Sequence, residues 1–440
     1  AFDVHGWDTL IDGDPVLARA ETEARLVNIG REDLACIVYT SGTGGAPRGV
    51  RQHHGMLLMN VSGAVDLISK DFGCDRNETF LSFLPLSHAY EHTGGQFFPI
   101  GLGAQIYYAE GLDKLASNIE EVQPSIMVVV PRLFEVLRTR IIKQISKQGM
   151  IPRHLMDWAV SSALRKESGH RRLTDYPLGL LLEHTLRPKV RAKFGGRIKA
   201  MVSGGAPLNP EIGSFFSAMG LTVLQGYGQT ESGPPLRGVE ARIAEDGEIL
   251  VRGELVMHGY WQNEAASANV LKFDPDSHGT APWLHTGDIG HIDEKGRIHI
   301  TDRKKDMIVN DKGDNVSPQK VESMLTLQPE IAQAMVHGDR RPYVVGLIVP
   351  DADWALQWAQ ENDETFDFKA LQTIPAFRSA IRTAIDRVNA ELSVIEKVRR
   401  FTFADEPVSI ENAEMTPSLK IRRHKLRERY GTRVDALYKR

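Results

Sequence analysis

A run of glycine and hydroxyl residues with one cation occupies positions 39–50, where the sequence reads Tyr-Thr-Ser-Gly-Thr-Gly-Gly-Ala-Pro-Arg-Gly-Val. Phosphate groups bind where glycine lets backbone N–H groups come close, and where hydroxyl donors and positive charge are added. The run has neither the Gly-Lys-Ser/Thr ending of a Walker loop nor the G-x-G-x-x-G spacing of a dinucleotide-binding loop. Its composition predicts a phosphate-binding loop, with an ordinary glycine turn as the alternative.

Six shorter motifs downstream contain glycine, hydroxyl or charged side chains. In chain order they are Leu-Pro-Leu-Ser-His at 84–88, Ser-Gly-Gly-Ala-Pro-Leu at 203–208, Gly-Tyr-Gly-Gln-Thr-Glu at 226–231, Thr-Gly-Asp at 286–288, Asp-Arg-Lys-Lys at 302–305 and Thr-Pro-Ser-Leu-Lys at 416–420. A carboxylate binds a hard cation, and a lysine can bridge two anions while charge spreads in a transition state.

The segments that carry the first motifs alternate short apolar runs with longer helical patterns. Residues 35–39, 125–130 and 199–202 each read as a buried strand, and Pro131 suits the first turn of the helix after the second run. Strands that alternate with helices and end in glycine turns predict a mostly parallel α/β sheet. Such a sheet carries its ligands at the carboxyl ends of the strands.

The pattern changes after about residue 239. Short strands separated by turns, at 248–253, 290–292 and 297–300, predict a small antiparallel subdomain. A helix from about residue 376 to 397 requires a second core, since one of its faces carries Phe377, Ile381, Ile385, Val388, Leu392 and Ile395. The predicted fold class is α/β: a large N-terminal domain with parallel and antiparallel sheets, and a smaller, mobile α+β C-terminal domain.

Composition narrows the class of protein. The chain has 440 residues, enough for two or three domains, and a net charge of −4, which favours no contact with nucleic acid. Cys36 and Cys74 cannot build a disulfide framework, so we expect a reducing, cytoplasmic environment. No apolar run of roughly 18 residues predicts a membrane span, and the first residues do not resemble a signal peptide.

The glycine-rich run and the six motifs, in this order, resemble the AMP-binding, adenylate-forming superfamily. Three segments are similar to its long-chain fatty acyl-CoA synthetase branch: Phe-Leu-Pro-Leu-Ser-His at 83–88, Pro-Arg-Leu-Phe-Glu at 131–135 and Thr-Pro-Ser-Leu-Lys at 416–420. Gly44 stands where the family usually has threonine, and Arg48 where it has lysine. The resemblance implies a ligase that uses ATP and Mg²⁺ to convert a fatty acid into acyl-AMP, and then transfers the acyl group to coenzyme A.

The resemblance also implies roles for single residues. ATP and AMP would be bound by Thr40, Ser41, Gly42, Thr43, Gly44, Gly45, Arg48, Gly204, Gly205, Ala206, Gly226, Tyr227, Gly228, Asp288 and Arg303. The catalytic residues would be Lys420, Thr230, Glu231 and His88, with Glu231 also holding Mg²⁺. Lys305 would be the hinge between the domains, and Gly313 would lie at the coenzyme A tunnel.

Two departures concern the extent of the chain. We expect residues 1–303 to form the AMP-binding large domain without its N-terminal part, and residues 304–440 to form the mobile C-terminal domain. The connection between Glu231 and the segment at 236–240 is shorter than the family usually has. Acyl-chain length and oligomeric state have no signal in the sequence.

Other functions stay open at this point. A fatty acyl-AMP ligase that loads a carrier protein, or a non-catalytic nucleotide-binding fragment, would share the same motifs. The pattern His-Ala-Tyr-Glu-His at 88–92 matches a zinc-peptidase motif. The basic run at 420–427 favours a solvated helix face, with contact to coenzyme A phosphates or to anionic lipid as alternatives. Peripheral contact with the inner membrane face would suit a fatty substrate.

Overall fold

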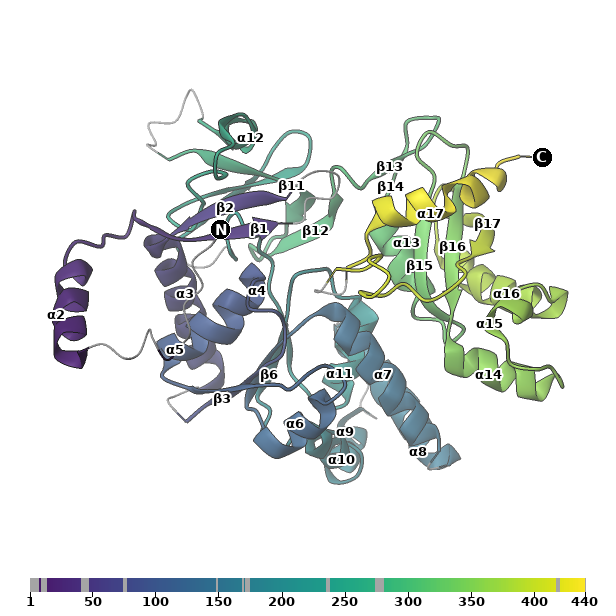
Figure 1. Ribbon diagram of the computed structural model, residues 1–440. Helices are drawn as coiled ribbons and strands as arrows, with labels where there is room; N and C mark the ends of the chain where they lie inside the picture. Colours follow the sequence, from purple (N-terminus) through teal and green to yellow (C-terminus); the bar gives the residue numbers. More distant parts are fainter. Residues whose placement is uncertain are drawn as a thin grey trace.

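The computed structural model of the chain describes residues 8, 14–40, 47–73, 77–147, 149–167, 170, 175–234, 238–273, 281–416 and 420–439 (Figure 1). Helix α2 (Pro15–Leu26) has no buried side chain and lies apart from the other elements at the left of Figure 1. Within the described ranges, no helix has the length and apolar character needed to cross a membrane.

A parallel sheet of five strands organises the N-terminal part. Its strand order is β4-β3-β5-β6-β7, and each neighbouring pair runs parallel. The strands are β3 (Thr79–Ser82), β4 (Gln105–Tyr108), β5 (Ile126–Val129), β6 (Ala200–Ser203) and β7 (Val223–Gln225). All residues of β3 and β5 are buried, as expected for strands that helices cover on both faces.

Helices on the two faces of this sheet complete its core. They are α3 (His54–Phe72), α4 (Ala89–Glu91), the π-helix η1 (His92–Phe97), α5 (Phe98–Leu102), α6 (Leu115–Val122), α7 (Pro131–Ser146), α8 (Met150–Glu167), α9 (Asp175–His184), α10 (Arg187–Lys193) and α11 (Pro210–Ala218). Phe80 of β3 packs with Phe98 of α5, whereas the next residue, Leu81, belongs to the cluster around Phe134 of α7. This alternation follows from the two-residue period of a strand.

A second sheet is antiparallel and lies beside a separate two-stranded pair. The second sheet contains β8 (Glu240–Ile243), β9 (Glu248–Arg252), β10 (Leu271–Lys272), β11 (Trp283–Ile292) and β12 (Ile298–Arg303), with α12 (Glu264–Val270) before β10. The pair consists of β1 (Leu34–Thr40) and β2 (Arg48–His53). The predicted antiparallel subdomain is therefore present.

The prediction that residues 35–39 form a buried strand of the parallel sheet was wrong. These residues form a strand, but β1 pairs antiparallel with β2 and takes no part in the parallel sheet. Only Val38 of this strand is buried. The apolar run resembled a core strand because its residues are β-branched or small, while its single partner strand leaves most of them half-buried or exposed.

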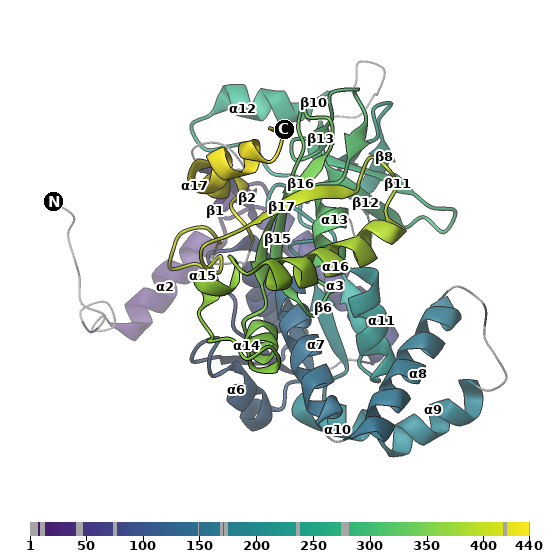
Figure 2. The same ribbon diagram turned by 90° about the vertical axis from the view of Figure 1, so that its right-hand side faces the viewer.

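The C-terminal part, residues 308–439, has its own sheet and its own core. Strand β16 (Val344–Pro350) pairs antiparallel with β15 (Ile331–His337) and parallel with β17 (Val398–Phe403). The remaining elements are β13 (Ile308–Val309), β14 (Asn315–Val316), α13 (Pro318–Leu325), α14 (Ala352–Glu361), α15 (Phe368–Leu371), α16 (Pro375–Glu391) and α17 (Arg423–Ala436). Figure 2 shows α16 in front of the sheet, and α17 packs on the other face through Leu426 and Tyr430. The predicted α/β fold class, with an α+β C-terminal part, is confirmed.

Helix α16 ends earlier than the apolar pattern predicted. The helix stops at Glu391, because Leu392 adopts an extended conformation with φ −90° and ψ 147°. Phe377, Ile381 and Ile385 are buried as expected, whereas Ile395 is 40% exposed. The apolar spacing therefore continued beyond the helix and into the turn that leads to β17.

Candidate active site

Two adjacent strands bring a buried carboxylate and a guanidinium together. Asp288 of β11 is opposite Arg303 of β12 in the strand register, and Arg303 Nε donates to Asp288 Oδ1 over 2.8 Å. The other oxygen, Oδ2, accepts from the Tyr227 hydroxyl at 2.9 Å and from Gln229 Nε2 at 2.5 Å. Burial and Asp288 raise the pKa of Tyr227, so the phenol remains a donor at neutral pH. These contacts fix a carboxylate that is only 4% exposed.

The turn before Asp288 is held by the motif's own side chains. Gly287 has a φ of 70°, a backbone conformation that glycine adopts without strain. The Thr286 hydroxyl donates to Ile249 O at 2.6 Å and accepts from the Asp288 backbone N–H at 3.1 Å. The Gly287 N–H donates to Glu248 Oε1 at 2.8 Å. The threonine and glycine thus orient the aspartate toward Tyr227 and Arg303.

A second carboxylate, Glu231, faces the strand that follows the predicted phosphate loop. The Tyr260 hydroxyl donates to Glu231 Oε1 at 3.0 Å, and the Arg48 guanidinium lies 5.3 Å from the centre of the Tyr260 ring. Burial raises the pKa of Tyr260 to about 12, and Glu231 adds to the shift. Gln52 Nε2 donates to the main-chain oxygen of Thr230 at 3.0 Å. One end of the loop therefore lies beside Glu231.

The predicted phosphate loop connects the two strands of the β1–β2 pair. Thr40 and Arg48 face each other in the register, at the ends of the loop. The predicted phosphate contacts Ser41, Gly42, Thr43, Gly44 and Gly45 lie outside the described residues.

Glycine turns at the carboxyl ends of β6 and β7 lie next to each other. The Gly226 N–H donates to Ser203 O at 2.8 Å, and the Gly204 N–H donates to Val129 O at 3.1 Å. A Cβ atom on Gly204 would stand 2.6 Å from the Tyr90 ring, and one on Gly228 would stand 2.7 Å from the backbone of Gly233. Glycine is therefore required at both turns for close packing. Gly205 and Ala206 follow in the first turn, where Ala206 is exposed.

His88 is neutral and lies close enough to Lys420 to sense its charge. Its Nδ1 accepts from the Tyr90 N–H at 3.2 Å and caps the short helix α4. Burial, and to a smaller extent Lys420, lower the pKa of His88 to about 4. An uncharged imidazole therefore stands at this side of the site at neutral pH.

Lys420 reaches this site from the C-terminal part of the chain. Its main-chain oxygen accepts from the Thr416 N–H at 2.8 Å, and its N–H donates to the Thr416 hydroxyl at 3.0 Å. Desolvation by the surrounding protein atoms and, to a smaller extent, the charge of Arg303 lower the pKa of the Lys420 amine to about 8, and Asp288 opposes the shift. The amine is thus electrostatically coupled to both members of the Asp288–Arg303 pair.

Comparison with known protein families identifies the family of this chain. The family described as AMP-binding enzyme matches residues 3–244, and the AMP-binding enzyme C-terminal domain matches residues 305–440. The chain belongs to the AMP-binding enzyme family. The resemblance that the motifs predicted is therefore confirmed.

Named relatives of this AMP-binding enzyme are fatty acid ligases. The long-chain-fatty-acid–CoA ligase FadD15 of Mycobacterium bovis is 30% identical over 98% of this chain and 74% of its own length. Human long-chain-fatty-acid–CoA ligase 1 is 29% identical over 92% of this chain and 61% of its own length. The predicted enzyme class, an acid–thiol ligase that forms AMP, agrees with these names.

Solved structures with the same fold include adenylation domains. The adenylation domain of a carboxylate reductase from Mycobacterium chelonae has a TM-score of 0.70 at 23% identity, covering 93% of this chain. The corresponding domain from Segniliparus rugosus, in complex with AMP and a co-purified carboxylic acid, also has a TM-score of 0.70, at 21% identity and 93% coverage. The chain spans 60% and 62% of the lengths of these two structures.

Two residues of this AMP-binding enzyme's site were missed by sequence reasoning. Gln229 lies at the variable position of the Gly-Tyr-Gly-Gln-Thr-Glu motif, yet it donates to Asp288 and to Thr286 O. Tyr260 belongs to no motif, and only its hydrogen bond to Glu231 reveals it. The position of Gln229 inside a motif was the one available signal.

Some predicted residues lie away from these contacts. Lys305 is exposed in the turn after β12, and Gly313 has a φ of 88° in the turn between β13 and β14. The zinc-peptidase pattern does not form a cluster in the described part of the chain, where the single group suited to a metal ion is Glu32, His53 and His258. Glu91 of that pattern instead accepts a hydrogen bond from the Ser82 hydroxyl in the core.

Proposed function

We propose that this AMP-binding enzyme is a long-chain fatty acid–CoA ligase. In the first step a fatty carboxylate attacks the α-phosphorus of ATP, which forms acyl-AMP and releases pyrophosphate. In the second step the thiol of coenzyme A attacks the acyl carbon, and AMP leaves. The observation that carries the proposal is the convergence of Lys420 with Asp288, Arg303 and His88.

The ribose and the adenine would bind on the β11–β12 side. Asp288 offers two carboxylate oxygens, and the 2′- and 3′-hydroxyl groups of a ribose can donate to them. Tyr227 and Gln229 hold this carboxylate in place, and Arg303 balances its charge. The Tyr227 ring would stack on adenine, while the turns that contain Gly204, Gly205, Ala206, Gly226 and Gly228 would border the base and the α-phosphate.

The phosphates would lie between the β1–β2 loop and Glu231. Thr40 and Arg48, with Ser41 to Gly45, would hold the β- and γ-phosphates, and Thr230 would bind the α-phosphate. Glu231 fits a magnesium site, because a carboxylate with phosphate oxygens is the ligand set that this hard cation prefers. Bound there, Mg²⁺ would neutralise the charge on the phosphates.

Lys420 would let the two anions react. A carboxylate and an α-phosphate repel each other, and a cation between them stabilises the charge that spreads in the transition state. With a pKa of about 8, most Lys420 amines are protonated at neutral pH. His88 would border the acyl group as a neutral side chain, so it adds no charge that would attract the carboxylate elsewhere.

The thioester step would require a different position of the C-terminal domain. We propose that the domain, residues 304–440, rotates about Lys305, withdraws Lys420, and brings the turn with Gly313 to the path of the pantetheine arm. Its contacts with the N-terminal part include three polar ones, Arg132 Nη1 to Ala332 O at 3.1 Å, Lys143 to Asp353 at 2.6 Å and Asn209 Nδ2 to Ser323 O at 3.4 Å, and an apolar one, Leu327 against the cluster around Phe134. Such contacts can be exchanged at low cost.

A direct test is to incubate the chain with ATP, Mg²⁺, coenzyme A and a series of fatty acids, and to identify the thioesters by mass. The proposal requires coenzyme A thioesters of long-chain acids together with AMP. A second candidate, transfer to a carrier protein, is supported by the similarity to carboxylate reductase adenylation domains, one of them solved as a didomain with its carrier. That candidate requires acyl-AMP without coenzyme A thioester. Absence of AMP with every acid would favour a non-catalytic nucleotide-binding protein.

A further inference from the structure

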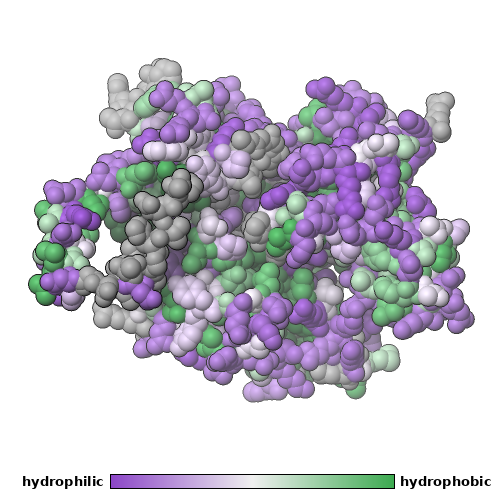
Figure 3. Space-filling model, in the orientation of Figure 1, coloured by the Kyte–Doolittle hydropathy of each residue, from purple (hydrophilic) through white to green (hydrophobic). Residues whose placement is uncertain are grey.

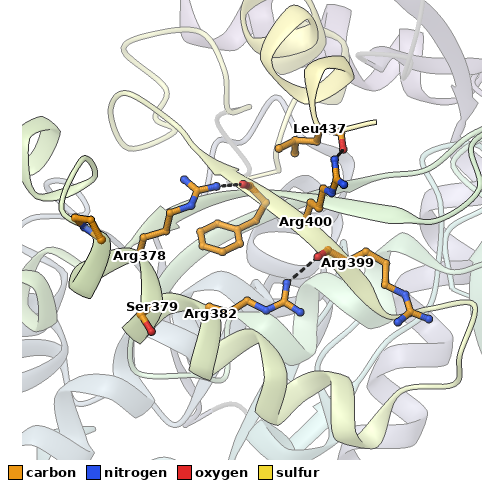
Figure 4. Close-up of a pocket in the computed structure, with 8 residues that line it drawn as sticks. Arg378, Ser379, Arg382, Arg399, Arg400 and Leu437 are labelled. Atoms are coloured by element: carbon orange, nitrogen blue, oxygen red, sulfur yellow. Dashed lines mark hydrogen bonds between the residues drawn. The ribbon is translucent and has the colours of Figure 1, made fainter. Parts of the chain in front are cut away.

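Four arginines line an open groove on the C-terminal part, between helix α16 and strand β17 (Figure 4). Arg378 and Arg382 come from the helix, and Arg399 and Arg400 come from the strand. The groove has a volume of about 430 Å³, and its remaining walls are Pro375, Ser379, Phe401 and Leu437. Among the described residues, none of the hydrogen bonds of these side chains reaches the site around Asp288 and Lys420.

Main-chain oxygens hold three of the four guanidinium groups in place. A guanidinium group has five N–H donors in a rigid fork, so one or two such bonds leave donors free for another acceptor. The Arg378 group also lies 4.6 Å from the centre of the Phe401 ring, which further limits its motion. The bonds are Arg378 to Phe401 O (2.7 Å), Arg382 to Arg399 O (2.8 Å), and Arg400 to Leu437 O (2.8 Å) and Lys439 O (2.9 Å).

The positive charge of the groove is mostly unbalanced. Asp386 pairs with Arg382 at 2.9 Å, and among the described residues it is the one carboxylate in an ion pair with a groove arginine. Three positive charges therefore remain, in a chain whose net charge is −4. The Arg399 side chain makes no hydrogen bond or ion pair with any described residue and is exposed. Clustered like charges attract a counter-ion of opposite sign.

We propose that this arginine groove binds a phosphate group. Phosphate suits it better than a carboxylate, because its oxygens can accept from more than one guanidinium fork at the same time. The phosphate could belong to a dissolved phosphate ester or to the headgroup of a lipid, and both would meet the same donors. The surface over α17, which packs on the opposite face of the sheet from α16, is mostly hydrophilic in Figure 3.

Arginine footprinting tests the groove without reference to the ligase reaction. The full chain is treated with phenylglyoxal, which modifies accessible arginines, with and without inorganic phosphate, and the modified positions are found by mass spectrometry. At a phosphate concentration near twice the dissociation constant, Arg382 and Arg399 should react about threefold more slowly. Arg340, which is 93% exposed and lies outside the groove, should react at the same rate.

Substitutions test whether the groove itself binds the phosphate, and vesicles test whether that phosphate belongs to a lipid. The double variant R382Q/R399Q should bind phosphate about tenfold more weakly, because two charge-assisted donors are lost, whereas R340Q should match the unchanged chain. Protection of Arg378 and Arg400 in these variants provides the measurement, and equal thermal midpoints show that folding is kept. The chain is also sedimented with vesicles of equal parts phosphatidylcholine and phosphatidylglycerol. The ligand is a lipid headgroup if the unchanged chain binds these vesicles, R382Q/R399Q does not, and free phosphate gives no protection. Protection by free phosphate alone would assign a dissolved ligand.

The proposal fails if neither phosphate nor these vesicles slow the modification of the groove arginines. It also fails if R382Q/R399Q keeps the full protection at Arg378 and Arg400, because binding would then lie elsewhere. Loss of ligase activity in the same variants is not part of the test, since the groove is separate from the adenylation site.

Discussion

Replacing Lys420 with alanine should separate the two half-reactions. The backbone of Lys420 is held by Thr416 through main-chain and hydroxyl bonds, and its side chain is exposed. K420A therefore removes the amine while leaving the fold, and the thermal midpoint should stay the same. The proposed ribose contacts of Asp288 and Arg303 are also kept, so the KM for ATP should change little.

The expected loss can be sized from the charge that is removed. One donor directed at developing negative charge is worth about 10²–10³ in rate, or roughly 3–4 kcal/mol. K420A should lower fatty-acid-dependent exchange of pyrophosphate into ATP by this factor. Thioester formation from supplied acyl-AMP and coenzyme A should be unchanged, because the proposed domain rotation withdraws Lys420 in that step.

The pH dependence gives an independent check on the same amine. Because its pKa is about 8, the free enzyme loses the cation as the pH rises through 8, and kcat/KM for adenylation should fall there. K420R keeps a cation that does not titrate in this range, so the falling limb should disappear even if its rate is lower. An equal loss of both half-reactions in K420A, or the same limb in K420R, would refute the assigned role.

Three further substitutions test the rest of the site. D288N should raise the KM for ATP about 10–100-fold, because a charged acceptor for ribose is lost, and should have a smaller effect with 2′-deoxy-ATP in the same assay. E231Q should raise the Mg²⁺ concentration for half-maximal exchange at least about tenfold; an unchanged magnesium titration would remove Glu231 as the ligand. The pKa of His88 is about 4 in the folded chain, against an ordinary value of 6.5. As the pH drops from 6.5 to 4, the unfolded chain therefore binds a proton before the folded chain does, and the free energy of unfolding falls. H88Q should therefore lessen the loss of stability between pH 6.5 and 4 by roughly 1–2 kcal/mol, measured by denaturant unfolding; an unaltered loss would contradict the low pKa.

The motifs predicted the family because they are local. The backbone conformation of a glycine turn or of a Thr-Gly-Asp sequence depends mainly on its own residues. Gly287, with its positive φ, and the hydrogen bond of the Thr286 hydroxyl are examples. The parallel sheet was predicted for a similar reason, since buried parallel strands such as residues 126–129 are continuous apolar runs.

Features that depend on distant partners could not be predicted. Residues 35–39 had the composition of a core strand, but the choice of β2 as partner placed them outside the parallel sheet. Tyr260 and Glu231 are 29 positions apart in the sequence, and no sequence pattern indicates that they are in contact. The end of α16 was also missed, because Leu392 and Ile395 continue the apolar spacing after the backbone has left the helix.

Labelling the carboxylate of a long-chain fatty acid with ¹⁸O tests the central claim most directly. If the carboxylate attacks the α-phosphorus, one labelled oxygen bridges the acyl group and the phosphate. That oxygen stays on AMP when coenzyme A displaces AMP from the acyl group. The account predicts AMP that carries one ¹⁸O atom for each acyl-CoA formed, as seen by mass spectrometry. Unlabelled AMP, or ADP and phosphate in place of AMP, would contradict it.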